Sequence, residues 1–308
     1  MSSAPKYLDL QVNGYAGLDF NSDEVTPERL RHVCELLRED SVEGILATII
    51  TAEIPKMVSW LRRIVDIRRQ DPLVADVIKG FHIEGPFINE TPGYVGAHPI
   101  HAVRPANVDD MKKLMEASDG LTRIVTLAPE RDPGQRLIRW LVGQKVVVSA
   151  GHCDPSLDEL RAGIDAGLTL FTHLGNGCPA MMHRHDNIIQ RALSLHNQLT
   201  LCFIADGVHI PFPTLGNFLE LVGMERTVLV TDAIMAARLG PGTYTLGERT
   251  VQIGEDLVAK EPGGQFFIGS TATMPRMAKL LKEKLHFSDS DIETFLIRNP
   301  RRVLESAA

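Results

Sequence analysis

The sequence predicts an α/β protein in which eight parallel strands close into a (β/α)8, or TIM, barrel. Short apolar runs rich in β-branched residues alternate with charge-bearing helical segments along the chain. There are eight such runs, and 308 residues are enough for one barrel of this kind. Polar side chains of catalytic type directly follow several of the runs, at the places where barrel strands would end.

The elements follow in order. The predicted strands are Tyr7–Val12, Gly44–Ile50, Val77–Ile83, Arg123–Leu127, Lys145–Ser149, Leu168–Thr172, Thr200–Ile204 and Thr227–Val230. The predicted helices are Pro27–Glu39, Pro55–Arg69, Val108–Ala117, Gly134–Val142, Ser156–Ala166, Ile188–Leu195, Pro213–Val222, Thr273–Leu285 and Asp289–Arg298. Thr26-Pro27 is typical of a helix start, with a capping side chain before a proline in the first turn. Residues 236–270 form an insertion, expected to fold as a small hairpin at the barrel mouth, and residues 1–308 are expected to form one domain.

Composition excludes several classes of partner. The formal net charge of −7 argues against a surface for nucleic acid or anionic membrane. The N-terminus lacks the apolar stretch of a signal peptide, and no apolar run is long enough to cross a bilayer. The four cysteines are scattered and form no CxxC pair, which is typical of reduced thiols. These features predict a cytoplasmic protein.

Acidic, amide and imidazole side chains stand at the ends of the predicted strands. In chain order they are Gln11, Asn13, Glu84, His152, His173, Asp206, His209 and Asp232. In a TIM barrel these strand ends meet at one mouth, where active sites are built. Two histidines and a glutamate from three strands make a His2Glu set, a known arrangement for catalytic zinc.

Each of these residues has a structural alternative when it is taken alone. A histidine at a strand end is more often a hydrogen-bonded structural residue than a metal ligand. Glu84 can pair with a buried arginine, and Asp232 can cap the segment that follows it. Taken together, five strand ends with such groups are not what packing would select, because each unpaired polar group near a core costs on the order of 1–3 kcal/mol. The combination favours a metal-dependent hydrolytic site.

Eight short motifs, in the same order along the chain, resemble those of the N-acetylglucosamine-6-phosphate deacetylase family of the amidohydrolase superfamily. They span the chain from about residue 7 to Val303. They are Leu8–Gly14, His82–Asn89, Gly96–His98, Ala150–His152, Thr172–Asn176, Ile204–His209, Leu229–Ala233 and Gly269–Met274. Any one motif is weak, but the ordered set is specific to the family.

The resemblance implies a role for each matching position. Glu84, His152 and His173 correspond to the metal ligands, Asp232 to the catalytic carboxylate, and His209 to the histidine at the acetamide carbonyl of the substrate. Arg184, eleven residues after His173, has the spacing of the phosphate-binding arginine. The other implied substrate contacts are Ala97, His98, Asn176, Gly177, Phe267, Ile268 and Gly269.

The chain departs from the family pattern at four places. Many amidohydrolases have His-x-His after the first strand, whereas this chain has Gln11 and Asn13, and neutral amides are poor zinc ligands. One divalent metal is therefore expected, zinc first, with iron, cobalt or manganese as alternatives. About six residues precede the first strand and few follow Pro300, so we expect a bare barrel without the family's accessory β-sandwich. The segments after His173 and Asp232 also differ, which leaves the exact substrate open.

The resemblance implies removal of the N-acetyl group from N-acetylglucosamine 6-phosphate, with a homodimer as the common assembly of the family. One alternative keeps the chemistry and changes the substrate to another N-acyl sugar phosphate, such as the galactosamine isomer, or to an N-acyl amino acid. The other alternative is a barrel that binds a sugar phosphate without hydrolysing it. A binding protein has no need of an aspartate opposite a metal-bound water, so Asp232 argues against this second alternative.

Overall fold

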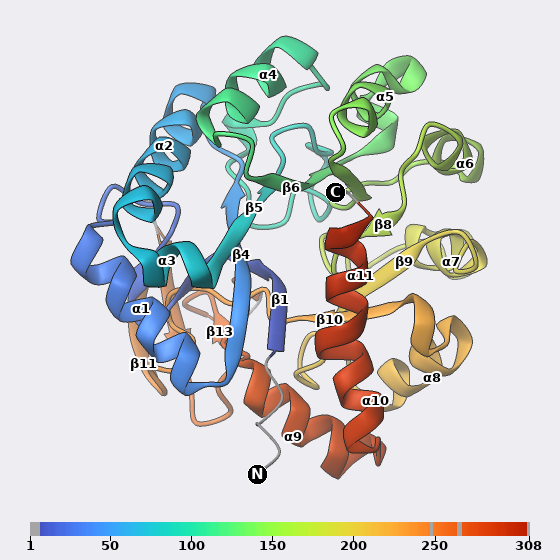
Figure 1. Cartoon of the computed structure of the whole chain (residues 1–308). Coiled ribbons are helices and arrows are strands. Elements are labelled where there is room, and N and C mark those ends of the chain that lie inside the picture. The colour runs from blue at the N-terminus through green and yellow to red at the C-terminus, as the bar shows by residue number, and fades with distance from the viewer. Residues whose placement is uncertain (1–6, 247–248, 264–266, 307–308) are drawn as a thin grey trace.

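The computed structural model describes residues 7–246, 249–263 and 267–306, and it contains the predicted barrel (Figure 1). Eight strands pair in chain order, each parallel to the next. A parallel bridge between Val12 and Ala233 joins the first and last strands of this sheet. The strands are β1 (Tyr7–Val12), β4 (Val42–Ile50), β5 (Ile78–Glu84), β6 (Thr122–Leu127), β7 (Val147–Ala150), β8 (Leu170–Phe171), β9 (Thr200–Ile204) and β10 (Thr227–Val230).

Helices surround the barrel on its outside (Figure 1). Two starts expected from the sequence are capped as predicted: Thr26 accepts from the backbone N–H of Arg29, and Ser156 forms a capping box with Glu159. The helices are α1 (Pro27–Glu39), α2 (Ile54–Gln70), α3 (Pro72–Val77), α4 (Val108–Ala117), α5 (Arg136–Gly143), α6 (Leu157–Asp165), α7 (Ile188–Ser194), α8 (Phe212–Val222), α9 (Met274–Leu285), α10 (Asp289–Glu293) and α11 (Asn299–Glu305).

Two helical segments differ from the prediction. The short helix α3 was not expected; Asp71 stabilises it by accepting from the backbone N–H groups of Leu73 and Val74. The last predicted helix, Asp289–Arg298, is instead α10 followed by a π-helical turn at Thr294–Arg298 and then by α11. Pro300 does not end the helix, because it lies in the first turn of α11, where a backbone N–H needs no partner within the helix.

The interior of the barrel explains where the polar strand-end residues point. Alternate residues of the strands, among them Leu8, Ile124, Ile204 and Val230, form one apolar cluster, which Val303 of α11 joins. Since side chains alternate along a strand, the residue two positions after an interior one also faces the barrel axis. Asp206 follows Ile204 in this way, Asp232 follows Val230, and Glu84 is the last residue of β5. The carboxylates of three strands are thereby directed to one mouth.

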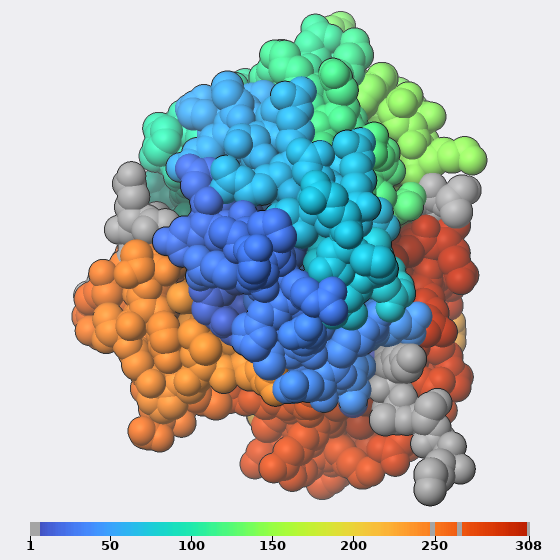
Figure 2. All heavy atoms as spheres, turned by 60° about the vertical axis from the view of Figure 1, so that its left-hand side comes forward, coloured from blue at the N-terminus to red at the C-terminus, as the bar shows by residue number. Residues whose placement is uncertain are grey.

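The insertion after β10 forms a three-stranded antiparallel sheet of β11 (Gly242–Leu246), β12 (Arg249–Ile253) and β13 (Ala259–Lys260). A small hairpin was predicted here; residues 247–248 and 264–266 lie outside the described residues, and Phe267 pairs with Lys260. Figure 2 shows the insertion (orange) beside the N-terminal segment (blue). The guanidinium of Arg238 joins them through a 2.7 Å contact with the Glu39 carboxylate of α1.

Apart from the barrel and the insertion, the described residues contain one further sheet, the short hairpin of β2 (Gly14–Tyr15) and β3 (Leu18–Asp19). No β-sandwich is present among these residues. None of the helices in the described part of the chain is both long enough and apolar enough to cross a membrane.

Candidate active site

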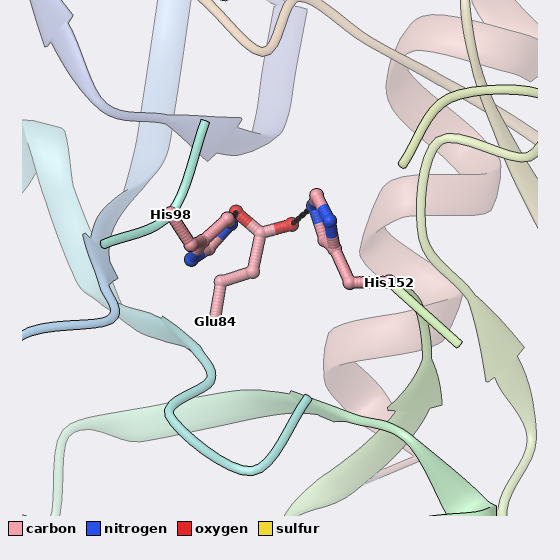
Figure 3. A group of neighbouring side chains, drawn as sticks. All are labelled: Glu84, His98 and His152. Atoms are coloured by element: carbon pink, nitrogen blue, oxygen red, sulfur yellow. Dashed lines mark ion pairs between the residues drawn. The ribbon is translucent and has the colours of Figure 1, made fainter. Parts of the chain in front are cut away.

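Glu84 is buried at the end of β5, and four side chains surround its carboxylate (Figure 3). The Nε2 atoms of His173 and His152 lie 2.9 Å and 3.5 Å from its Oε1 atom. The Nε2 atom of His98 lies 3.9 Å from Oε2, on the other side of the carboxylate. The side-chain amide of Gln11 donates to Oε1 at 3.1 Å. Residues from β1, β5 and three loops thus converge on one buried carboxylate.

Hydrogen bonds on the far side of the rings determine which imidazole nitrogen faces Glu84. The Nδ1 atom of His152 donates to the backbone carbonyl of Tyr94 at 2.8 Å, so its Nε2 atom presents a lone pair when the ring is neutral. Nδ1 of His98 lies 2.8 Å from the Thr51 hydroxyl, which itself donates to a backbone carbonyl and so accepts from the ring. The Nδ1 atom of His173 is buried and has no partner within the described residues.

This donor set fits a divalent metal ion. Neutral imidazole nitrogens and one carboxylate are the ligands of catalytic zinc, and a ligating histidine commonly donates its other N–H to a backbone carbonyl, as His152 does. The ligand atoms of Glu84, His98 and His152 lie within 4.8 Å of one another. The structure also brings together the three ligands predicted from the sequence, Glu84, His152 and His173. It adds His98, for which a substrate contact was predicted.

The charges within this cluster stabilise one another. Burial alone raises the pKa of Glu84, but hydrogen bonds from His152 and His173 outweigh it and hold the pKa well below its usual range. Burial lowers the pKa of His173, but the hydrogen bond with Glu84 and the negative charges of Glu84 and Asp232 raise it by more. An anionic carboxylate that attracts cationic groups suits a metal site, because a metal ion can replace the protons held between Glu84 and the imidazoles.

Backbone strain is concentrated at this mouth. His152, His173 and Asp232 each have a left-handed backbone conformation, with φ of 51°, 31° and 51°. This conformation costs a residue with a side chain on the order of 1–2 kcal/mol, and it is typical of functional sites. Two glycines allow the loops to approach His152: a Cβ on Gly177 would lie 2.7 Å from its Nδ1 atom, and one on Gly96 3.0 Å from its Cε1 atom.

Asp232 and the first strand form the second side of the site. Asp232 follows β10, and its Oδ1 atom accepts from the side-chain amide of Asn13 at 2.7 Å. Burial raises the pKa of Asp232, and this effect exceeds the lowering by the nearby charge of His173. The two amide residues of β1 therefore each hold a carboxylate, Gln11 that of Glu84 and Asn13 that of Asp232.

A chain of buried hydroxyl groups lies beneath the cluster, one step deeper in the barrel. Ser149, Thr172 and Thr126 are joined by hydrogen bonds of 2.7 Å, and Thr126 lies 2.7 Å from Nε2 of His82. Burial lowers the pKa of His82 to about 4, so the ring is neutral, and its Nδ1–H donates to the carbonyl of Leu10. The hydroxyls therefore donate in one direction, toward His82. The chain connects β5, β6, β7 and the end of β8, and three of these strands lead to Glu84, His152 and His173.

His209 lies at the end of β9 in a short loop. Its Nδ1 atom contacts the carboxylate of Asp206 at 2.7 Å, and its ring packs against Phe267 with centroids 5.3 Å apart. Phe267 is 47% exposed, so it lies at the rim of the site. The structure therefore places two of the predicted substrate-binding residues, His209 and Phe267, against each other.

The remaining predicted substrate contacts are divided between the site and its edge. Asn176 donates its side-chain amide to the carbonyl of His173 at 3.3 Å, and Gly177 lies against His152. Gly269 has a positive φ of 59°, and a Cβ there would collide with Ile234. Arg184 lies farther out: it is exposed and makes no ion pair or hydrogen bond within the described part of the chain. Ala97 precedes His98 in the loop after β5.

Sequence reasoning did not identify several groups that orient the site. Thr51 and the Tyr94 carbonyl hold two of the imidazole rings, and neither has a local motif that indicates this contact. The hydroxyl chain of Ser149, Thr126 and Thr172 could have been found, because all three occupy inward positions of strands two or four residues from an apolar interior residue.

Known proteins with similar sequences carry one kind of activity in their names. The chain is 30% identical over 300 residues to the N-acetylgalactosamine-6-phosphate deacetylase of Escherichia coli O157:H7, covering 97% of this chain and 77% of that protein. It is also 30% identical over 303 residues to the N-acetylglucosamine-6-phosphate deacetylase of Bacillus subtilis, covering 97% of this chain and 74% of that protein. A search of models of protein families finds no match.

A solved structure is similar over almost the whole chain. It is a variant of the N-acetyl-D-glucosamine-6-phosphate deacetylase of Mycobacterium smegmatis in complex with N-acetyl-D-glucosamine-6-phosphate. The TM-score is 0.85 at 29% sequence identity, and the match covers 98% of this chain and 77% of that chain. The fold and the sequence are therefore similar to the same group of enzymes.

Proposed function

Because the chain belongs to the N-acetylglucosamine-6-phosphate deacetylase family of the amidohydrolase superfamily, we propose that it hydrolyses the N-acetyl group of N-acetylglucosamine 6-phosphate. The products are glucosamine 6-phosphate and acetate. The observation that supports this proposal most directly is the buried cluster of Glu84, His152 and His173, with Asp232 at the same mouth of the barrel. These are the groups that a metal-dependent amide hydrolase requires.

We infer that Glu84, His152 and His173 hold one divalent metal ion, zinc by preference, and that His98 stands beside it. When bound, such an ion activates water and polarises the amide carbonyl. Zinc is favoured by the imidazole and carboxylate donors, although iron, cobalt and manganese accept the same ligands. Gln11 and Asn13 donate hydrogen bonds to carboxylates, so the strand that often supplies ligands for a second metal supplies none here.

Asp232 takes the proton of the attacking water and delivers it to the leaving amine in this mechanism. The second transfer is required because an amine does not depart as an anion. His209 donates a hydrogen bond to the carbonyl oxygen, on which negative charge develops during the attack. The charge of Arg184 holds the phosphate, which lies remote from the bond that breaks and orients the amide.

The experiment that tests the proposal is acetate release from N-acetylglucosamine 6-phosphate by protein loaded in turn with zinc, iron, cobalt and manganese. Metal-dependent turnover is expected, with about one ion bound per chain. Stoichiometric metal binding without acetate release would exclude this substrate and direct the search to other N-acyl compounds. Protein that binds none of the four metals would contradict the hydrolytic mechanism and favour a sugar-phosphate-binding barrel.

A second candidate substrate is the galactosamine isomer, because the chain is as similar to an N-acetylgalactosamine-6-phosphate deacetylase as to a glucosamine-specific one. The two sugars differ in the configuration of one hydroxyl group. Comparing kcat/KM for both isomers under identical metal loading separates the candidates. A higher value for the galactosamine isomer would replace the first assignment and leave the chemistry unchanged.

Arg184→Ala is expected to raise KM for the phosphorylated sugar by on the order of 10- to 100-fold, because a charge-assisted contact with phosphate is lost. The unphosphorylated N-acetyl sugar should be hydrolysed by the variant as well as by the wild type. Arg161→Ala is the matched control, since Arg161 is also exposed and forms an ion pair with the neighbouring Asp158. An equal loss on both substrates would contradict the phosphate role of Arg184.

We further infer that the barrel and its insertion act as a single catalytic domain over residues 1–308. The contact between Phe267, at the end of the insertion, and His209 supports this, because the insertion then completes the rim of the site. The free thiols of Cys34, Cys153, Cys178 and Cys202 support a cytoplasmic location. Membership of a family in which dimers are common supports a homodimer.

A further inference from the structure

The loop that follows β9 is organised by one buried carboxylate. The Oδ1 atom of Asp206 accepts from the backbone N–H groups of Val208 and His209, each at 2.9 Å. Its Oδ2 atom accepts from the Nδ1 atom of His209 at 2.7 Å. The side chains of Asp206 and His209 are both 7% exposed. Asp206 thus fixes the turn of the loop and the orientation of the imidazole ring with the same carboxylate.

This geometry determines the position of the ring proton. A carboxylate accepts hydrogen bonds and, when ionised, has none to donate, so the Nδ1 atom of His209 must carry a hydrogen. Burial raises the pKa of Asp206, but the hydrogen bond and charge of His209, together with the two backbone N–H groups, lower it by more, so the carboxyl group is ionised. In a neutral ring, Nε2 is then an acceptor.

An amide carbonyl oxygen is also only an acceptor, so a neutral His209 with its proton on Nδ1 cannot donate to it. Donation from Nε2 requires the imidazolium form, with a proton on each nitrogen. Two carboxylates interact with the ring from different elements. Asp206 contacts the ring from the β9 loop, and Asp232 interacts with it electrostatically from the end of β10. Phe267, which packs against the ring from the end of the insertion, has no charge.

We propose that Asp206 is a positioning residue for amide hydrolysis, which holds His209 as an imidazolium whose Nε2–H donates to the carbonyl oxygen of the substrate. This inference rests on the proposed function. It extends that function to Asp206, which is assigned no contact of its own with metal or substrate. Asp206 acts only through His209. It keeps the ring in one orientation, and its negative charge lies beside the positive charge of the imidazolium.

The first test measures the ring itself and needs no substitution. In metal-loaded wild-type protein with 15N-labelled histidine, the His209 signals, assigned with the His209→Gln variant, should show a protonated Nδ1 atom at every pH. Nε2 should also carry a proton at the pH of maximal turnover. In Asp206→Asn, which keeps an acceptor oxygen and loses the charge, the titration of Nε2 should move down by one pH unit or more. A wild-type ring with its neutral proton on Nε2, or an unchanged titration in the variant, would overturn the proposal.

The second test is kinetic. Asp206→Asn should lower kcat on the order of 10²-fold with little change in KM, because the lost donation matters most when charge develops on the oxygen. The basic limb of its pH–rate profile should move to lower pH, since the active imidazolium is lost sooner. The double variant Asp206→Asn/His209→Gln should be no slower than His209→Gln alone, because Asp206 acts only through His209. Losses of kcat that multiply in the double variant would contradict the proposal. So would an Asp206→Asn enzyme with the wild-type pH–rate profile.

These outcomes are distinguishable from failure of the proposed function. If wild-type protein hydrolyses neither sugar phosphate, the kinetic test cannot be carried out. The NMR measurement of the His209 ring still decides whether Asp206 determines its protonation. Metal content provides the structural control: Asp206→Asn should keep the metal stoichiometry of the wild type, because Glu84, His152 and His173 lie at the ends of other strands. A variant that loses its metal would show that Asp206 supports the whole mouth rather than His209.

Discussion

Asp232→Asn is expected to lower kcat by on the order of 10²–10⁴ while the protein remains folded and retains its metal. Asparagine keeps the oxygen that accepts from the side-chain amide of Asn13, so the position of the side chain is preserved. It cannot accept the proton of the attacking water or return one to the amine. The ligand cluster around Glu84 is untouched. The measurement is kcat for acetate release together with metal content determined on the same protein.

The pH dependence of wild-type turnover provides a second test of the role of Asp232. Burial raises the pKa of Asp232 above its value in the unfolded chain, and only the ionised form can act as a base. Turnover should therefore rise with pH along an acidic limb whose midpoint lies above the usual pKa range of an aspartate. This limb should be absent from any residual activity of Asp232→Asn. Asp186→Asn is the matched control, because Asp186 is exposed and paired with Arg191. A variant Asp232→Asn that retains wild-type turnover would remove Asp232 from the mechanism.

The barrel could be predicted because each strand can be recognised from the pattern of its own residues. The bounds of β1, β9, β10, α1 and α4 agree with the prediction to the residue. Buried strands of a parallel sheet are read from short β-branched apolar runs, and the helices between them from capping residues and apolar periodicity. Since the carboxyl ends of parallel strands meet, the approach of Glu84, His152 and His173 to one another followed from their positions after three different strands.

The position of His98 was not predictable in the same way. His98 lies in a long loop after β5, and no strand or helix period relates it to Glu84. Its ring is directed by Thr51, a residue 47 positions away, and it approaches Glu84 only because the loop folds back over the mouth. The family resemblance indicated a substrate contact for His98. A contact with the Glu84 carboxylate and a contact with substrate are both available to a residue at this place.

Backbone strain and contacts between distant segments account for the other features of the structure that the sequence did not predict. His152 and His173 have a left-handed backbone, and the loops of Gly96 and Gly177 pack against the His152 ring, so this conformation occurs among tertiary contacts that local propensity does not indicate. The π-helical turn before α11 has the same origin. The turn lies against the underside of the barrel, and the sequence around Pro300 indicated only a helix end.

Glu84→Gln is expected to reduce bound metal from about one ion per chain to near none and to abolish acetate release. Glutamine has nearly the same shape as glutamate but lacks the negative charge that faces the three imidazoles around it. It also leaves Gln11 facing a second neutral amide. Metal content by elemental analysis, fold by circular dichroism and turnover with each added metal are measured on the same preparation.

The control for this substitution is Glu90→Gln, the same chemical change at an exposed residue paired with Arg131. It should alter neither metal content nor turnover. His98→Gln then separates the ligands from their neighbour: if His152 and His173 complete the metal site with Glu84, His98→Gln should keep the metal and impair turnover. Loss of the metal in His98→Gln would show that His98 is a ligand. Full metal binding by Glu84→Gln would contradict the prediction for Glu84, because it would show that the imidazoles alone hold the ion.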